Sequence, residues 1–150
     1  MTSALRALAL MLPLLAAACG SAGKGEPEVK NAWVRLNAVP GMPAAGYFTI
    51  TGGKADDRLL SIESPDAKRA ELHGNMTHEG MTMMMPLADV PLPAGKAVSF
   101  APGGSHAMLF DLGKAVKPGG AVALRFTLGS GARLEASARV IAAGDEAPRF

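Results

Sequence analysis

The stretch AVALRFTLGSGARLEASARVI, residues 121–141, decides the fold. It contains two β-like runs, 121–128 and 132–141, and the turn signal GSG lies between them at 129–131. Apolar and polar side chains alternate along the second run, which is typical of a β-strand with one buried face. Its apolar positions are Leu134, Ala136, Ala138 and Val140, and its polar positions are Arg133, Glu135, Ser137 and Arg139. The stretch therefore predicts two β-strands joined by a tight turn.

Similar runs fill the chain before this stretch, separated by clusters of Gly, Pro and Asp. They lie at 29–37, 45–51, 58–64, 68–73, 81–85, 97–100 and 105–112. After the N-terminal segment, no window carries a long apolar stripe with the 3.6-residue period of a helix. Eight or nine short strands at this spacing predict a single all-β domain, built as an antiparallel β-sandwich or barrel.

The first 18 residues, MTSALRALALMLPLLAAA, carry one charge, at Arg6, and then a short apolar run that ends in small residues. This pattern is typical of a secretory signal peptide rather than of a membrane span. The next residue is Cys19, the only cysteine, and Leu-Ala-Ala-Ala-Cys resembles a bacterial lipobox. We therefore expect cleavage before Cys19 and lipidation of its thiol. The alternative is an ordinary signal peptide with a cysteine near the cleavage site by chance.

The rest of the chain divides into three parts. Residues 19–28 are small, polar and glycine-rich, which predicts a flexible tether. Residues 29–142 form the predicted domain, and 143–150 a loose tail. The lipid would hold the domain on the periplasmic side of a membrane. Gly20 and Ser21, with no aspartate beside the cysteine, favour the outer over the inner membrane by resemblance to sorted lipoproteins.

Charge and cysteine content exclude several classes of protein. Removal of Arg6 from the 15 basic residues leaves 14 against 13 acidic ones, and this balance argues against a nucleic-acid partner. With Cys19 lipidated, no disulfide can form, so the fold depends on its core. Apolar residues make up 49% of the chain, which is enough for such a core.

Histidine and methionine are concentrated in about one quarter of the chain. Imidazole nitrogen and thioether sulfur together are ligands for a soft metal ion, above all Cu(I). The region 73–108 contains His73, His78 and His106, together with Met76, Met81, Met83, Met84, Met85 and Met108. This clustering indicates copper handling.

The predicted strands sort these donors by face. His106 and Met108 are two residues apart on one strand, so they share a face at a spacing of about 7 Å. In the run 81–85, Met81, Met83 and Met85 share one face, and Met84 lies on the other. For those three, flexible core filling is the favoured interpretation.

Other candidates are more ambiguous. Met76 and His78 fall in a predicted loop, where they could shield a bound ion, hold a second one with Met81, or be ordinary loop residues. Trp33 is most simply interpreted as a core aromatic residue.

The spacing of four of these residues follows the pattern H-x10-M-x21-H-x-M. This resembles the signature of the periplasmic copper chaperone family PCu(A)C, and AWVR at 32–35, ELH at 71–73 and PGGSHAML at 102–109 agree with it. The resemblance implies a cupredoxin-like β-sandwich that binds Cu(I) without being an enzyme. It also implies delivery of the ion to copper centres of respiratory oxidases or to their assembly factors. The implied ligands are His73, Met84, His106 and Met108, and the dense methionines around Met84 leave open which sulfur is the primary one.

Several other functions fit the sequence less well. A blue-copper electron carrier needs a cysteine thiolate within the domain, and the sequence has none there. A zinc hydrolase is disfavoured because thioethers bind Zn(II) poorly. A redox-active copper enzyme is harder to exclude, although no general base or substrate pocket is indicated. A copper-sequestering or tolerance lipoprotein, or a structural lipoprotein without metal, remains the alternative to a monomeric carrier.

Overall fold

The computed structural model describes residues 25–150; the predicted signal peptide, Cys19 and residues 20–24 of the tether lie outside the described residues. Ten strands form in the described part, and no helix in it is long and apolar enough to cross a membrane. The strands are β1 (Glu28–Arg35), β2 (Ala44–Thr51), β3 (Asp57–Glu63), β4 (Ala67–His78), β5 (Met81–Pro86), β6 (Val90–Leu92), β7 (Ala97–Phe100), β8 (His106–Leu112), β9 (Ala121–Leu128) and β10 (Arg133–Ile141).

All nine predicted runs form strands, and the all-β fold class is confirmed. The tenth strand, β6, was missed because it has three residues with Pro91 at its centre. Proline cannot donate to a sheet ladder and is confined to edges. Consistently, β6 ends the strand order and pairs only with β3.

One predicted boundary was wrong. The run at 68–73 was expected to end in a loop, but β4 continues to His78 and pairs with β5. The two residues between them, Glu79 and Gly80, have φ angles of 50° and 80°. Two successive positive φ angles are typical of the tight hairpin turn whose twist matches that of the strands. Met76 and His78 therefore lie on a strand, not in a loop.

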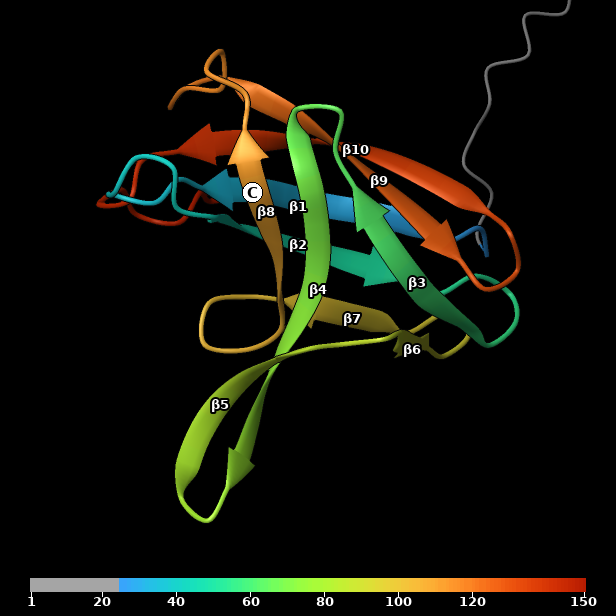
Figure 1. Ribbon diagram of the computed structural model, residues 1–150. Helices are drawn as coiled ribbons and strands as arrows, with labels where there is room; N and C mark the ends of the chain where they lie inside the picture. The colour runs from blue at the N-terminus through green and yellow to red at the C-terminus, as the bar shows by residue number, and fades with distance from the viewer. Residues whose placement is uncertain (1–24) are drawn as a thin grey trace, which may run out of the picture.

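The strands pair in the order β5-β4-β8-β2-β1-β10-β9-β3-β6, and β7 pairs with β2 beside β8. The sheet folds over itself, so that β3, β4 and β8 cross in front of β1, β2, β9 and β10, and β3 contacts β4 (Figure 1). All neighbours are antiparallel except β1 and β10, which run parallel. This arrangement is the predicted β-sandwich with one exception to its antiparallel pairing.

The core lies between these two layers. Phe48 stacks on Phe100 with ring centroids 4.3 Å apart, and it meets Phe126 edge-on at 4.8 Å. The alternation predicted for the run 132–141 is confirmed, because Ala138 and Val140 are buried and Leu134 and Ala136 pack partly buried against the core, while the polar positions between them are exposed. On β9, the inner face consists of Val122, Leu124, Phe126 and Leu128.

A second, smaller cluster lies on the outer face of β1, β2 and β10. It consists of Trp33, Tyr47 and Ile141, with the rings of Trp33 and Tyr47 4.4 Å apart. Trp33 is thus buried as expected, but outside the main core. The Arg35 guanidinium lies over Trp33 and donates to the backbone oxygen of Asp145 at 3.0 Å, which holds part of the segment after β10 against β1.

The far half of the β4–β5 hairpin projects beyond the sandwich (Figure 1). Every residue of β5 is exposed, and so are Asn75 to His78 on β4. The interpretation of Met81, Met83 and Met85 as core filler was therefore wrong. Their face meets no second layer, because the ribbon has left the sandwich at this point.

Candidate metal centre

The candidate centre is built across β4 and β8 on the outer face of the sheet. His73 and His106 are directly opposite each other in this antiparallel pair. Opposite residues point to the same face, and the two imidazole centroids are 6.0 Å apart. Residues 33 positions apart in the sequence are thereby placed side by side.

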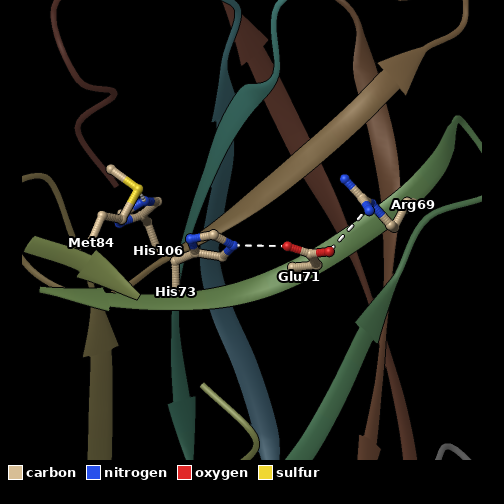
Figure 2. Close-up of polar contacts among 5 residues, drawn as sticks. All are labelled: Arg69, Glu71, His73, Met84 and His106. Carbon is tan, nitrogen blue, oxygen red and sulfur yellow. Dashed lines mark hydrogen bonds and ion pairs between the residues drawn. The ribbon is translucent and has the colours of Figure 1, made fainter. Parts of the chain in front are cut away.

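The third donor comes from β5. Met84 is opposite Asn75, which is two residues after His73 on β4, so Met84 shares the face of His73. Its sulfur lies 3.3 Å from Nε2 of His106, and Figure 2 shows the thioether against that ring. Two ligands of one tetrahedral ion, with metal–nitrogen about 2.0 Å and metal–sulfur about 2.3 Å, would be about 3.5 Å apart. The observed separation suits a shared ion.

A backbone carbonyl fixes the tautomer of His106. Nδ1 lies 3.1 Å from the carbonyl oxygen of Gly104, which can only accept a hydrogen bond, so Nδ1 carries the proton. In the neutral ring, Nε2 then presents a lone pair toward the lone pairs of the Met84 sulfur. Two acceptors that face each other at 3.3 Å repel unless a cation or a proton lies between them.

A carboxylate orients His73 in the same way. Nε2–H of His73 donates to Glu71 at 2.9 Å, and the other oxygen of Glu71 lies 3.3 Å from Nε of Arg69 (Figure 2). Nδ1 of His73 is buried without a hydrogen-bond partner and lies on the side of the ring that faces His106 and Met84. A buried, unpartnered nitrogen lone pair is costly, and a carboxylate behind a histidine is the usual support of a metal ligand.

Exposure differs among the three donors. His106 is 7% exposed and the His73 side chain 12%, whereas Met84 is 55% exposed. Tyr47 of the outer cluster lies beside His106, with ring centroids 6.4 Å apart. An ion held here would have its nitrogen ligands shielded and its sulfur ligand at the surface.

The fourth predicted ligand lies one row away. Met108 is on the same face as His106, half-buried and directly opposite Glu71. The structure thus brings His73, Met84 and His106 together and places Met108 beside them. The auxiliary candidates Met76, His78 and Met81 lie on the other face of the hairpin and are not part of this cluster.

Sequence reasoning missed Glu71 and Asn75. Both are two residues from His73 on the same strand, and this spacing puts them on its face. The Asn75 side chain donates to the backbone oxygen of Gly103 at 2.9 Å, which ties the hairpin to the loop before His106. The alternation of β4 was the available signal, but the polar partners became meaningful only once β4 was known to continue past residue 73.

The donor set has a clear chemical preference. Within residues 25–150, no group of three or more His, Cys, Asp or Glu side chains is placed to hold a metal ion. The cluster contains two imidazole nitrogens and one thioether, with a second thioether adjacent. Such a set suits a soft, monovalent ion and offers little to Mg²⁺, Ca²⁺ or Zn²⁺.

Solved structures share this fold. The copper-bound PCuAC domain from PmoF2 is 23% identical, covers 80% of this chain and 96% of its own, and has a TM-score of 0.65. Apo-DR1885 from Deinococcus radiodurans is 23% identical over 95% of both chains, with a TM-score of 0.59. CuI-DR1885 from the same organism is 21% identical over 83% of both chains, with a TM-score of 0.55. These similarities establish the cupredoxin-like fold of PCuAC domains for this chain.

Sequence comparison identifies closer relatives. "Putative lipoprotein Lxx21020" of Leifsonia xyli subsp. xyli is 34% identical over 105 residues, which are 69% of this chain and 62% of the relative. The chain thus spans about three fifths of that relative's length. The family model described as "LpqE-like: Putative lipoprotein LpqE-like" matches residues 28–140, from the start of β1 almost to the end of β10. The chain therefore belongs to the LpqE-like lipoprotein family and has a PCuAC-type fold.

Proposed function

We propose that this protein is an extracytoplasmic Cu(I) carrier that holds the ion between Nδ1 of His73, Nε2 of His106 and the sulfur of Met84, with Met108 as the fourth ligand. The observation that carries the proposal is the convergence of the His106 lone pair and the Met84 sulfur at 3.3 Å, beside the unpartnered Nδ1 of His73. The structures of a copper-bound PCuAC domain and of CuI-DR1885 on the same fold support it.

The distribution of exposure suggests how the ion would be transferred. The buried imidazoles would keep Cu(I) in place, while the exposed Met84 would be the ligand that an acceptor displaces first. A thiolate or imidazole of the acceptor could then enter the coordination sphere before the histidines release the ion. This is carriage without catalysis, since no bond of a substrate is made or broken.

The proposed acceptors are copper centres of respiratory oxidases or the assembly factors that fill them, as the PCu(A)C resemblance implies. We propose that a lipid on Cys19 anchors the monomeric protein on the periplasmic side, with the outer membrane favoured. Membership of a lipoprotein family supports the anchor. Residues 20–28 would span at most ~30 Å when extended, so the carrier would work close to the membrane surface.

Copper sequestration is the second candidate. The observation that favours it is the set of exposed methionines on β5, which exceeds what one carrier site needs. Incubation of the Cu(I)-loaded protein with an acceptor that has thiolate ligands separates the two functions, because a carrier should pass the ion on and a sequestering protein should retain it.

Metal competition tests the proposal. The Cys19→Ser chain is offered Cu(I) and Zn(II) against a chelator of known affinity for each ion. We expect one tightly held Cu(I) and far weaker retention of Zn(II), because the ligands are soft. His106→Gln should abolish the preference, and the matched control His78→Gln should preserve it for the first equivalent. Equal retention of the two metals by the unmodified site would contradict the proposal.

A further inference from the structure

We propose that the far face of the β4–β5 hairpin is a second soft-metal site, in which His78, Met76, Met81 and Met83 hold a second monovalent ion such as Cu(I) or Ag(I). This inference goes beyond the carrier function and does not depend on the first centre. It assigns a role to the exposed methionines that neither the core nor the first centre uses.

The pairing of the hairpin brings the four donors together. His78 is directly opposite Met81, and Met76 is directly opposite Met83 in the next row on the same face. Opposite Cβ atoms in an antiparallel pair are about 5 Å apart and diagonal neighbours about 7–8 Å. Long thioether side chains and an imidazole can close these distances around one ion, so a set of one nitrogen and three sulfurs is within reach.

Nothing in the described structure covers this face. The methionines on it are 42% to 64% exposed, and the His78 side chain makes no hydrogen bond or ion pair within residues 25–150. The hairpin projects past the sandwich, so these side chains do not contribute to the core (Figure 1). The thioethers and the imidazole of this face can therefore bind a metal ion without giving up contacts that stabilise the fold.

The two sites are separated by the alternation of the strands. Met84 and Thr82 point to the face of His73, while Met81, Met83 and Met85 point to the opposite face. The positive φ angles of Glu79 and Gly80 fix the register of the hairpin, and a slip of one residue would exchange the two faces. The second site therefore shares no ligand with the first.

Ligand chemistry selects the ion. Three thioethers and one imidazole are softer than the donors of the first centre, so the site should reject Zn(II) and Mg²⁺. Its donors are exposed and must lose rotamer freedom to converge, whereas the imidazoles of the first centre are held in place by Glu71 and Gly104. The second ion should therefore bind more weakly than the first.

Nuclear magnetic resonance of methionine methyl groups tests the inference. The full-length Cys19→Ser chain, labelled with ¹³C at the methionine methyls, is titrated with Ag(I), which is diamagnetic and redox-inert. We expect the Met84 signal to shift with the first equivalent and the signals of Met76, Met81 and Met83 with the second. The signal of Met42, an exposed methionine far from the hairpin in sequence, should not move.

Variants separate the two sites. Met81→Leu combined with His78→Gln should weaken binding of the second equivalent at least tenfold and leave the first unchanged, whereas Met42→Leu should change neither. Met84→Leu should weaken the first equivalent and leave the Met81 and Met83 shifts in place. If the Met76, Met81 and Met83 signals stay unchanged at two equivalents, the second site does not exist. If instead only the Met84 signal fails to respond, the carrier centre fails and the second site stands.

Discussion

At the scale of single residues, the chemistry of the candidate centre depends on groups that orient the two histidines but are not themselves proposed as metal ligands. The Gly104 carbonyl and the Glu71 carboxylate each accept the ring proton of one histidine, at 3.1 and 2.9 Å. Each thereby leaves the other nitrogen free to ligate, Nε2 in His106 and Nδ1 in His73. The two histidines thus use different nitrogens because their supports approach from different sides.

Replacement by leucine should affect Cu(I) affinity at Met84 but not at its neighbour Met83. Met84→Leu should weaken binding of the first Cu(I), because Met84 alone on β5 has its sulfur against His106. Met83→Leu should leave that affinity unchanged, because Met83 points to the other face. Both side chains are exposed and leucine roughly keeps their volume, so each change should cost less than ~1.5 kcal/mol of unfolding free energy. Equal losses of first-site affinity in Cu(I) competition titrations would show that the assignment of faces is wrong.

Glu71 is a positioning residue, and Glu71→Ala should lower Cu(I) affinity about 10-fold to 100-fold, the usual effect of losing such a support. Nitrogen NMR of His73 should at the same time show a mixture of ring tautomers in place of one. Glu135→Ala is the matched control, because Glu135 pairs with Arg125 on the exposed face of β9 and β10. A defined His73 tautomer in the Glu71→Ala protein would contradict the role assigned to the carboxylate.

The PCu(A)C resemblance pointed to His73, Met84, His106 and Met108 as candidate ligands, but not to the groups that support them. The structure brings the side chains of His73, Met84 and His106 together because β5, β4 and β8 are consecutive in the sheet. The role of Gly104 depends on how the loop before β8 turns back toward the ring, and the sequence carries no signal for that. The role of Asn75 depends on the continuation of β4, which the prediction ended five residues too early.

At the scale of elements, the position of Met84 in the candidate centre depends on the β4–β5 hairpin, which carries this residue. A two-stranded ribbon is only marginally stable by itself. This ribbon is held to the sandwich by the pairing of β4 with β8 and by the bond from Asn75 to Gly103. Substitutions in the turn of the hairpin should therefore change the Cu(I) affinity of the candidate centre.

Gly80→Ala tests this coupling. Gly80 has a φ of 80°, and a Cβ added there meets no atom within 4 Å, so the only cost is the backbone strain of about 1–2 kcal/mol. We expect amide hydrogen exchange at 75–78 and 81–85 to become faster and first-site Cu(I) affinity to fall by up to about tenfold. Gly95→Ala, with φ 63° and equally open space in another turn, should leave copper binding unchanged. Equal effects of the two variants on copper affinity would contradict the proposed coupling between the hairpin turn and the first site.

Strand pairing was less predictable than strand existence. Alternation identifies β10 and its buried face, because it reflects local contact with the core. The parallel contact of β1 with β10 joins the two ends of the domain, and no local pattern encodes it. The exposure of β5 was missed for the same reason, since a methionine-rich strand has the same sequence whether or not a second layer covers it.

At the scale of the whole molecule, the residues that stabilise the sandwich and the residues of the candidate centre lie in different places. The main core fills the space between the layers, while the candidate centre lies on the outer face with the Trp33 and Tyr47 cluster beside it. Global stability should then respond to groups far from the metal. Asp57 is one of them, because it links the start of β3 to the turn between β9 and β10.

The pKa of Asp57 lies below its ordinary value of 3.8, mainly because the Ser130 hydroxyl donates to the carboxylate, aided by the backbone N–H of Arg58. A carboxyl with a lowered pKa in the folded protein stabilises the fold fully above the ordinary value and loses this effect as the pH falls through the lowered one. Asp57→Ala should therefore reduce stability in urea at about pH 7 and much less at about pH 2. An equal loss at both pH values would show that the carboxylate charge is not responsible.

X-ray absorption of the protein loaded with one equivalent of Cu(I) tests the central claim most directly, because it counts nitrogen and sulfur neighbours of the ion. We predict a mixed shell with two nitrogens and at least one sulfur. Met84→Leu should remove one sulfur, and His106→Gln should remove one nitrogen. A shell of nitrogen and oxygen alone, or a shell that neither substitution alters, would contradict the assignment of His73, Met84 and His106 as the copper ligands.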